Sequence, residues 1–123
     1  MITAVDSSVL IAIIAGECDA ADWVHVLARV RAEGALVCCD VVYAEIGAGL
    51  GSQTELDRVL IALGIQFDTM QADAAWQAGE IFRQYLIPDF LVGAHAQVQA
   101  DRLAAKDRGY LRRYFPAVSL LQP

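Results

Sequence analysis

Short apolar runs alternate with longer segments of mixed polarity along the whole chain. Each run is only a few residues long and rich in strand-forming side chains. Such runs are typical of parallel strands that are buried on both faces. They predict strands over residues 2–5, 35–39, 65–68, 102–105 and 117–121.

The segments between these runs place apolar side chains every three or four residues, as one face of a helix requires. Ser7 or Ser8 fits the N-cap of the first helix, and Asp40 fits that of the third. Ser52, with Glu55 three residues later, forms a capping-box pattern at the start of the fourth. The pattern predicts helices over residues 7–17, 18–34, 40–51, 52–64, 70–86, 87–100 and 108–115.

Strands that alternate with helices form parallel sheets with helices on both faces. The sequence contains no repeat, linker or low-complexity segment, and its 123 residues suit one domain. We therefore expect residues 1–123 to form a single α/β domain. Its architecture would be a three-layer α/β/α sandwich around a mainly parallel sheet of four or five strands.

Composition narrows the class of protein. A hydrophobic content of 57% predicts a folded core and argues against disorder. No apolar run approaches the ~18 residues of a membrane span, and no basic flank marks a signal peptide. These features predict a cytoplasmic protein, and the surplus of apolar residues favours a homodimer. The three cysteines show no CxxC spacing, so we expect free thiols.

Charge is distributed unevenly along the chain. The net charge of −6 by itself argues against a nucleic-acid partner. However, residues 1–101 hold 14 acidic and 4 basic side chains, whereas residues 102–123 hold 5 basic and 1 acidic. The simplest interpretation of this basic segment, without any function, is a solvated helix face.

In open α/β sheets, ligands bind outside the carboxyl ends of the strands. Six acidic residues fall at or near this predicted edge: Asp6, Asp40, Asp68 and Asp107 after strands, and Glu45 and Asp89 on neighbouring helices. Asp40 fits a helix cap and Asp68 an ordinary turn, so neither needs a chemical role. Asp89 also suits a helix N-terminus on electrostatic grounds alone.

Glu45 and Asp6 are harder to explain structurally. Glu45 lies in a segment with almost no polar face, and Asp6 ends an apolar strand, so we expect both carboxylates to be desolvated. Burying such groups without partners costs several kcal/mol. Lys106 is the only lysine in the chain, so few bases are available to neutralise these acids. A hard divalent cation such as Mg²⁺, which prefers carboxylate oxygens, would resolve the repulsion.

Four motifs resemble those of one known family, in its order and approximate spacing: VDSSVLIAI (5–13), CCDVVYAEIGAGL (38–50), PDFLVGAHA (88–96) and AAKDRGYLRRYFP (104–116). Over essentially its whole length the chain resembles the PIN-domain nucleases, in particular the VapC-type toxins of bacterial toxin–antitoxin pairs. PDFLVGAHA followed by DRGYLRRYFP is the most specific part of the resemblance.

The resemblance implies the strand order 3-2-1-4-5, which brings strands one and four together where the order reverses. It also implies an acidic cluster of Asp6, Glu45, Asp89 and Asp107. Asp6, Asp89 and Asp107 are then the expected ligands, direct or through water, of one or two Mg²⁺ or Mn²⁺ ions. Glu45 is either a further ligand or the residue that orients the attacking water.

The implied activity is that of a metal-dependent endoribonuclease, the toxin of a toxin–antitoxin pair. Bound metal would activate water and stabilise charge on the RNA phosphate. Ser7 or Ser8 would hydrogen-bond a neighbouring carboxylate, and capping the helix is their structural alternative. Arg108, Arg112 and Arg113 would hold RNA phosphates. A VapB-like antitoxin would cover the cleft and place an arginine against the acids.

Two departures from the family pattern keep other functions open. Ala105 stands where many members carry Thr or Ser, two residues before the last acid. Only Leu86 and Ile87 precede the PDF motif, where relatives often have a longer basic stretch. Both departures favour a PIN-like domain that binds RNA or protein without catalysis. A receiver or phosphatase using an aspartyl phosphate is a further alternative, but it expects a second acid close to Asp6, which DSSV lacks.

Overall fold

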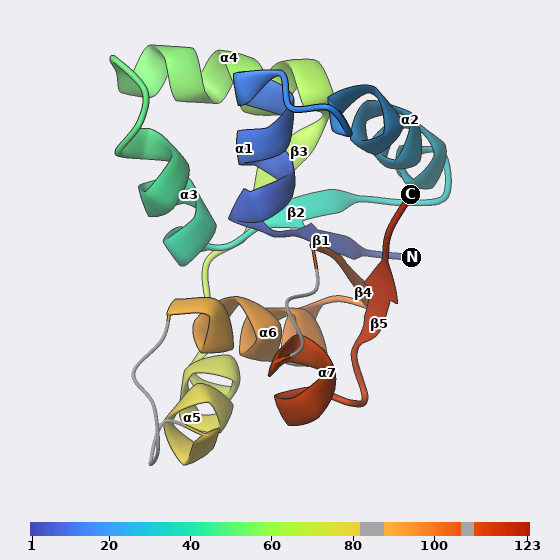
Figure 1. Cartoon of the computed structure of the whole chain (residues 1–123). Coiled ribbons are helices and arrows are strands. Elements are labelled where there is room, and N and C mark those ends of the chain that lie inside the picture. Colours follow the sequence, from blue (N-terminus) through green and yellow to red (C-terminus); the bar gives the residue numbers. More distant parts are fainter. Residues whose placement is uncertain (82–87, 107–109) are drawn as a thin grey trace.

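Five short parallel strands form the centre of the protein (Figure 1). The structure is a computed structural model, and it describes residues 1–81, 88–106 and 110–123, the side chains of 88–90 and 110 excepted. The strands are β1 (Thr3–Val5), β2 (Leu36–Cys38), β3 (Ile65–Phe67), β4 (Arg102–Ala104) and β5 (Ser119–Leu121). Their order is β3-β2-β1-β4-β5, and each neighbouring pair is parallel, as predicted.

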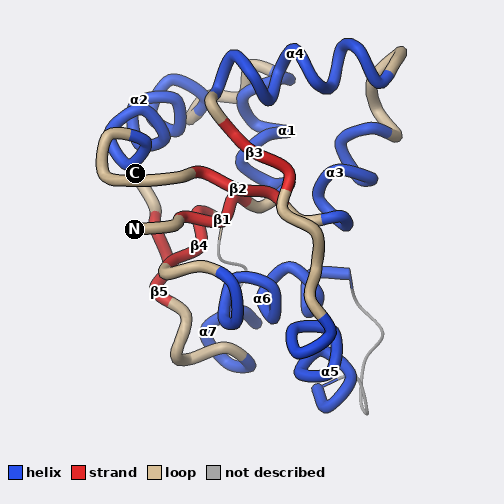
Figure 2. The backbone as a smooth tube through the Cα atoms, turned by 180° about the vertical axis from the view of Figure 1, so that it is seen from behind, coloured by secondary structure: helices blue, strands red, loops and turns tan. Residues whose placement is uncertain are grey.

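Helices cover both faces of this sheet, which confirms the predicted three-layer sandwich. One layer holds α1 to α4, and the layer on the opposite face holds α5 to α7, as two opposite views show (Figures 1 and 2). The helices are α1 (Ser7–Ala15), α2 (Ala20–Arg31), α3 (Asp40–Gly47), α4 (Gln53–Leu63), α5 (Ala72–Ile81), α6 (Pro88–Gln99) and α7 (Tyr110–Tyr114). The predicted extension of α5 over residues 82–86 lies outside the described residues.

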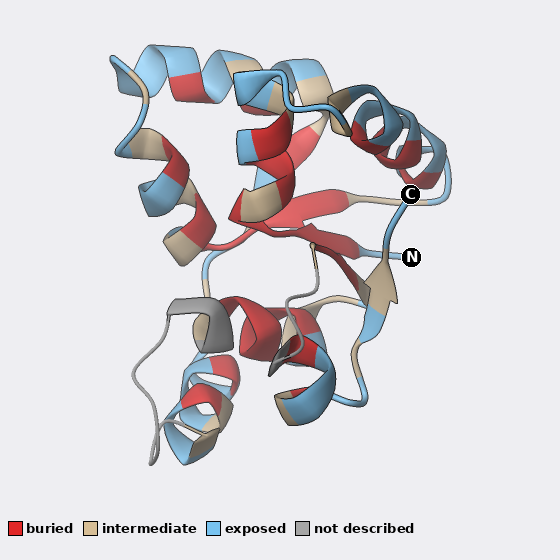
Figure 3. Ribbon diagram, viewed as in Figure 1, coloured by how far each residue is buried: buried red, intermediate tan, exposed pale blue. Residues whose placement is uncertain are grey.

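Burial follows the position of each strand in the sheet (Figure 3). Every residue of β1 and β2 is buried, because helices cover them on both faces. The outer strands are more open: two of the three residues of β3 are exposed, and no residue of β5 is fully buried. Burial on both faces therefore explains the apolar runs of the central strands better than those of the outer strands.

The helix caps correct two predictions. The N-cap of α1 is Asp6, not a serine: its side chain accepts a hydrogen bond from the backbone N–H of Ser8. The N-cap of α3 is Cys39 without a side-chain bond, so Asp40 does not cap that helix. Ser52 does cap α4, accepting the N–H of Glu55 at 3.2 Å. Asp6 therefore both caps α1 and lies at the carboxyl edge of the sheet.

The cysteines are free thiols, as expected. Cys18 is exposed, whereas Cys38 and Cys39 are buried at the end of β2. Burial raises the pKa of Cys38 to about 12, so this thiol stays protonated and unreactive at neutral pH.

Some large apolar side chains remain on the surface of the described residues. Ile61, Phe67 and Trp76 are each more than half exposed. The homodimer predicted from composition remains a prediction. None of the helices among the described residues has both the length and the apolar character that a membrane crossing requires.

Helix α6 packs unusually close to the end of α7. A Cβ atom added to Gly93 would lie 2.5 Å from the ring of Phe115, which is itself buried. Phe115 therefore occupies the space that any larger residue at position 93 would need. This contact fixes how closely the segment after α7 can approach α6.

We predict that Gly93→Ala lowers the free energy of unfolding by about 1–3 kcal/mol, because the added methyl group overpacks the contact with Phe115. Urea denaturation followed by circular dichroism measures the change. Gly79→Ala is the matched control: Gly79 is also helical, and a Cβ there meets nothing within 4 Å. The control should be neutral or stabilising by up to ~1 kcal/mol. Equal effects of the two substitutions would contradict the packing argument.

Candidate active site

Asp6 lies where β1 ends and α1 begins, at the carboxyl edge of the sheet. Its backbone is extended, with φ −81° and ψ 154°, and only 6% of its surface is exposed. The Oδ2 atom accepts two hydrogen bonds from Ser8, from the hydroxyl at 2.6 Å and from the backbone N–H at 3.3 Å. The prediction of a desolvated carboxylate at this strand end is confirmed, and the two bonds fix its orientation.

Ser8 joins this carboxylate to the end of β4. Its hydroxyl oxygen donates to Asp6 and accepts the backbone N–H of Lys106 at 3.2 Å. The backbone N–H of Asp6 in turn donates to the carbonyl oxygen of Ala104 at 2.9 Å. The carboxyl ends of β1 and β4 are thus held together at the point where the strand order reverses, the expected place for a ligand site.

Glu45 reaches the same place from α3. The hydroxyl of Ser7 donates to Oε2 of Glu45 at 3.0 Å, so this carboxylate lies beside the N-terminus of α1. The expectation that Glu45 is buried is wrong, because its side chain is exposed. Val42 and Ile46, four residues apart, form the buried face of α3, and Glu45 lies to one side of that face.

The structure therefore brings together four of the predicted site residues: Asp6, Ser7, Ser8 and Glu45. The backbone of Asp89 lies in the first turn of α6, but its side chain is outside the described part. Asp107 and Arg108 lie outside the described residues altogether. Within the described part, no group of three or more His, Cys, Asp or Glu side chains is placed to hold a metal ion.

Two bases of the segment 102–123, Lys106 and Arg102, form ion pairs with acids. Lys106 forms ion pairs with Glu17 at 2.8 Å and Asp19 at 2.9 Å, and hydrogen bonds to these acids raise its pKa. Arg102 donates to the hydroxyl of Thr3 and pairs with Glu33. These two bases therefore stabilise the fold beside β4.

Two other bases of this segment, Arg112 and Arg113, lie on α7, and their side chains are exposed. The guanidinium carbon of Arg113 is 5.4 Å from the ring centroid of Tyr114, a cation–π distance. Both residues therefore lie at the surface of α7.

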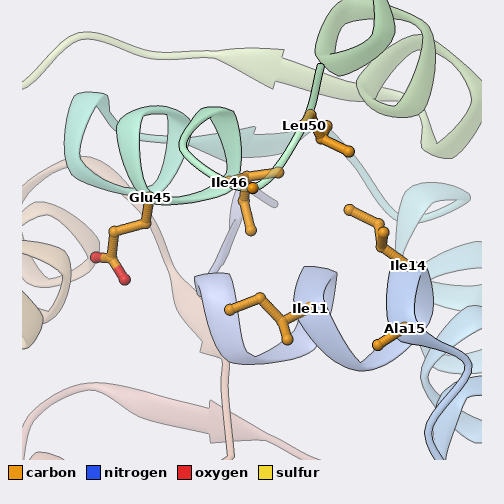
Figure 4. A pocket seen from close by; sticks show the side chains of 7 residues that line it. Ile11, Ile14, Ala15, Glu45, Ile46 and Leu50 are labelled. Atoms are coloured by element: carbon orange, nitrogen blue, oxygen red, sulfur yellow. The ribbon is translucent and has the colours of Figure 1, made fainter. Parts of the chain in front are cut away.

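An apolar groove runs between α1 and α3 (Figure 4). Its volume is about 220 Å³. Ile11 and Ile14 are partly exposed on the α1 side, Ile46 and Leu50 lie opposite, and the carboxylate of Glu45 stands at one end. The groove thus combines apolar walls with a negative charge at its end nearest the candidate site.

Sequence reasoning missed a polar network on the other face of the sheet. His95 is buried, and its Nε2 lies 2.8 Å from Oδ2 of Asp68. Asp68, which had looked like an ordinary turn residue, therefore has a specific partner. The spacing of His95 and Gln99 on one helix face was the available signal, but nothing in the sequence identified Asp68 as the residue they meet.

Comparison with protein families identifies the family of this chain. The PIN domain family model matches residues 3–116, nearly the whole chain. The chain belongs to the PIN domain family. The resemblance found in its motifs is thereby confirmed at the level of the family. No curated protein matches the sequence.

Solved structures share the fold of this PIN domain. A chain of VapBC2 from Rickettsia felis, bound to a promoter DNA fragment, has 17% identity and a TM-score of 0.68, with 98% of each chain covered. A toxin–antitoxin complex from Klebsiella pneumoniae gives 18% identity and 0.70, covering 98% of this chain and 96% of that one. VapBC-1 from nontypeable Haemophilus influenzae gives 14% identity and 0.68, covering 99% and 98%. At these identities the likeness concerns the fold.

We predict that Ser8→Ala lowers the free energy of unfolding by about 1–2 kcal/mol, because one hydroxyl serves both the Asp6 carboxylate and the Lys106 N–H. Thermal and urea unfolding of the purified variant measure this change. Ser7→Ala is the matched control, since its hydroxyl bonds only the exposed Glu45 among the hydrogen bonds described. If Ser7→Ala proves as destabilising as Ser8→Ala, the bridging role of Ser8 is wrong.

Proposed function

We propose that this PIN domain is a metal-dependent endoribonuclease of the VapC type, the toxin of a toxin–antitoxin pair. The observation that carries the proposal is the paired support of two carboxylates at the carboxyl ends of β1 and β4. Ser8 holds Asp6, and Ser7 holds Glu45, on a fold shared with chains of toxin–antitoxin complexes.

The donor chemistry of the site suits Mg²⁺ or Mn²⁺. Both ions prefer oxygen ligands, and both described acids present carboxylates. We propose that Asp6, Asp89 and Asp107 hold one or two ions, with Glu45 as a further ligand or as the group that orients water. When bound, such an ion lowers the pKa of its water and stabilises charge on the scissile phosphate.

Hydrogen bonds from the chain's own residues orient the proposed ligands before substrate binds. Ser8 donates to Oδ2 of Asp6 and so restrains the orientation of this carboxylate. The side chain of Glu45 is exposed, and the hydrogen bond from Ser7 restrains it near α1. Such hydrogen bonds orient ligands and preserve activity in metal sites generally.

RNA binding needs positive charge beside this acidic site. Arg112 and Arg113 are exposed on α7, which follows β4 in the chain, and we propose that they contact RNA phosphates together with Arg108. The negative net charge is then no obstacle, since the basic side chains are concentrated in one segment.

The decisive test is cleavage of RNA by the purified protein with Mg²⁺ or Mn²⁺, compared with EDTA. We expect Asp6→Asn, Glu45→Gln and Asp89→Asn each to lower kcat/KM by about 100-fold or more, because each removes a charge that acts on the metal or the water. Cleavage is followed by mapping new RNA ends.

Asp22→Asn is the control, since it also removes one negative charge but lies exposed on α2, outside the site. It should cleave like the wild type. Full activity in Asp6→Asn or Asp89→Asn would overturn the assignment. If the wild type binds no Mn²⁺ by calorimetry and cleaves no RNA, the binding-only alternative is supported instead.

We further propose that an antitoxin segment occupies the groove between α1 and α3. The apolar walls suit a helix or strand with apolar side chains, and Glu45 at the end of the groove suits an arginine. The similar folds are those of chains in toxin–antitoxin complexes, which supports a partner of this kind. An arginine placed there would also neutralise the acids that the proposed chemistry uses.

A designed amphipathic peptide with leucines at helical spacing and a terminal arginine tests the groove. We expect Ile14→Glu to weaken its binding at least tenfold, measured by fluorescence anisotropy, because a charge enters the apolar wall. Ile61→Glu is the control: Ile61 is 76% exposed on α4 and does not line the groove. A peptide with glutamate in place of arginine should bind more weakly. Equal binding by Ile14→Glu and Ile61→Glu would contradict the proposal.

A further inference from the structure

A buried histidine lies in α6, away from the proposed chemistry. His95 is only 1% exposed and is among the largest fully buried side chains of the described residues. Its Nε2 lies 2.8 Å from Oδ2 of Asp68, which follows β3. Because a carboxylate only accepts hydrogen bonds, Nε2 carries the proton and donates it. The imidazole thus makes a directed contact between α6 and the sheet edge.

Gln99 repeats this contact one turn later on α6. Its Nε2 donates to Oδ2 of Asp68 and to the carbonyl oxygen of Thr69, both at 3.0 Å. Its Oε1 accepts the backbone N–H of Gln71 at 2.7 Å. His95, Gln99 and Asp68 together form what we call the α6 clamp. Four hydrogen bonds of the clamp therefore join one face of α6 to the connection between β3 and α5.

That connection is itself fixed to the sheet. The backbone N–H of Asp68 donates to the carbonyl oxygen of Cys38, at the end of β2, at 2.8 Å. Asp40 accepts the hydroxyl of Thr69 at 2.9 Å and the N–H of Met70 at 2.6 Å. Partial burial of Asp40 opposes ionisation, but these two bonds outweigh it and lower the pKa of Asp40. The clamp therefore ties α6 to a segment that is anchored to β2 and α3.

A second contact holds the opposite side of α6. Phe115 occupies the space beside Gly93, so α6 is fixed between this ring and the clamp. This contact limits how closely the helix can approach the ring. Hydrogen bonds have preferred directions and distances, so the clamp also fixes the axial position of α6.

The axial position of α6 matters because Asp89 lies in its first turn. Asp89 precedes His95 by six residues, which corresponds to about 9 Å along a helix axis at 1.5 Å per residue. A helix transmits a displacement along its length with little change. Any shift of α6 at the clamp therefore moves the backbone of Asp89 by a similar amount.

We propose that His95 is a positioning residue, whose hydrogen bond to Asp68 fixes α6 and so places Asp89 at the carboxyl edge of the sheet. The catalytic consequence rests on the proposed nuclease function, whereas the fixing of α6 does not. An apolar residue of similar size would fill the same space. It would not fix the position of α6 along the helix axis.

The first measurement concerns α6 alone and needs no metal. His95→Leu fills the space without a donor, and we expect the backbone amides of α6 to exchange hydrogen at least tenfold faster, while those of α2 change little. His95→Gln offers an amide donor near the position of Nε2 and should restore much of the protection. Gln97→Ala is the control on the same helix: it loses an exposed bond to Gln77 but leaves the clamp intact.

The second measurement connects the clamp to the site. In His95→Leu we expect the Mn²⁺ dissociation constant to rise and kcat to fall, each about tenfold, while KM for RNA stays within twofold. A merely structural role would lower the folded fraction without changing the metal affinity of folded protein. If His95→Leu does not fold, Gln99→Leu breaks the other half of the clamp and is measured in the same way.

The outcomes separate the two proposals. Unchanged exchange of α6 in His95→Leu and Gln99→Leu would overturn the positioning role, whatever the activity. Faster exchange with unchanged Mn²⁺ affinity and kcat would overturn its link to Asp89. A wild type that neither binds Mn²⁺ nor cleaves RNA would overturn the nuclease proposal and this link with it, while the exchange data still decide whether the clamp fixes α6.

Discussion

The candidate site depends on one structural constraint, the parallel pairing of β1 with β4 at the centre of the sheet. The chain first builds β2 and β3 on one side of β1, and then crosses to place β4 on the other side. The backbone of Asp6 donates to Ala104, and Ser8 accepts from Lys106, so the two strand ends are held together. Residues almost one hundred positions apart thereby share one edge.

Serine hydroxyl groups hydrogen-bond the acidic side chains at this edge. Family members often carry a hydroxyl residue two positions before the last acid, where this chain has Ala105. The hydroxyl of Ser8 reaches the same region from α1 and contacts both Asp6 and the backbone of β4. A hydroxyl that restrains an acid is therefore present at this edge, and it acts on Asp6.

The basic side chains of residues 102–123 lie in two places. Lys106 and Arg102 pair with acids around β4, and Arg112 and Arg113 lie exposed on α7. On the opposite side of β1, the groove between α1 and α3 ends at Glu45. The proposed substrate contacts and the proposed antitoxin contacts thus approach the acids from different elements.

The alternation of strands and helices follows from the sequence, because hydrophobic periodicity is a local property of the chain. Family motifs added the strand order and pointed to Asp6, Glu45, Asp89 and Asp107. Local pattern assigned the α1 cap to a serine, although Asp6 bonds the N–H of Ser8 only two residues away. It also predicted that Glu45 is buried and gave Asp68 no specific partner, because the residues that these side chains meet lie far away in the sequence. These features depend on tertiary packing, because Ser7 meets Glu45 where α1 and α3 lie side by side, and Asp68 meets His95 where the connection after β3 contacts α6.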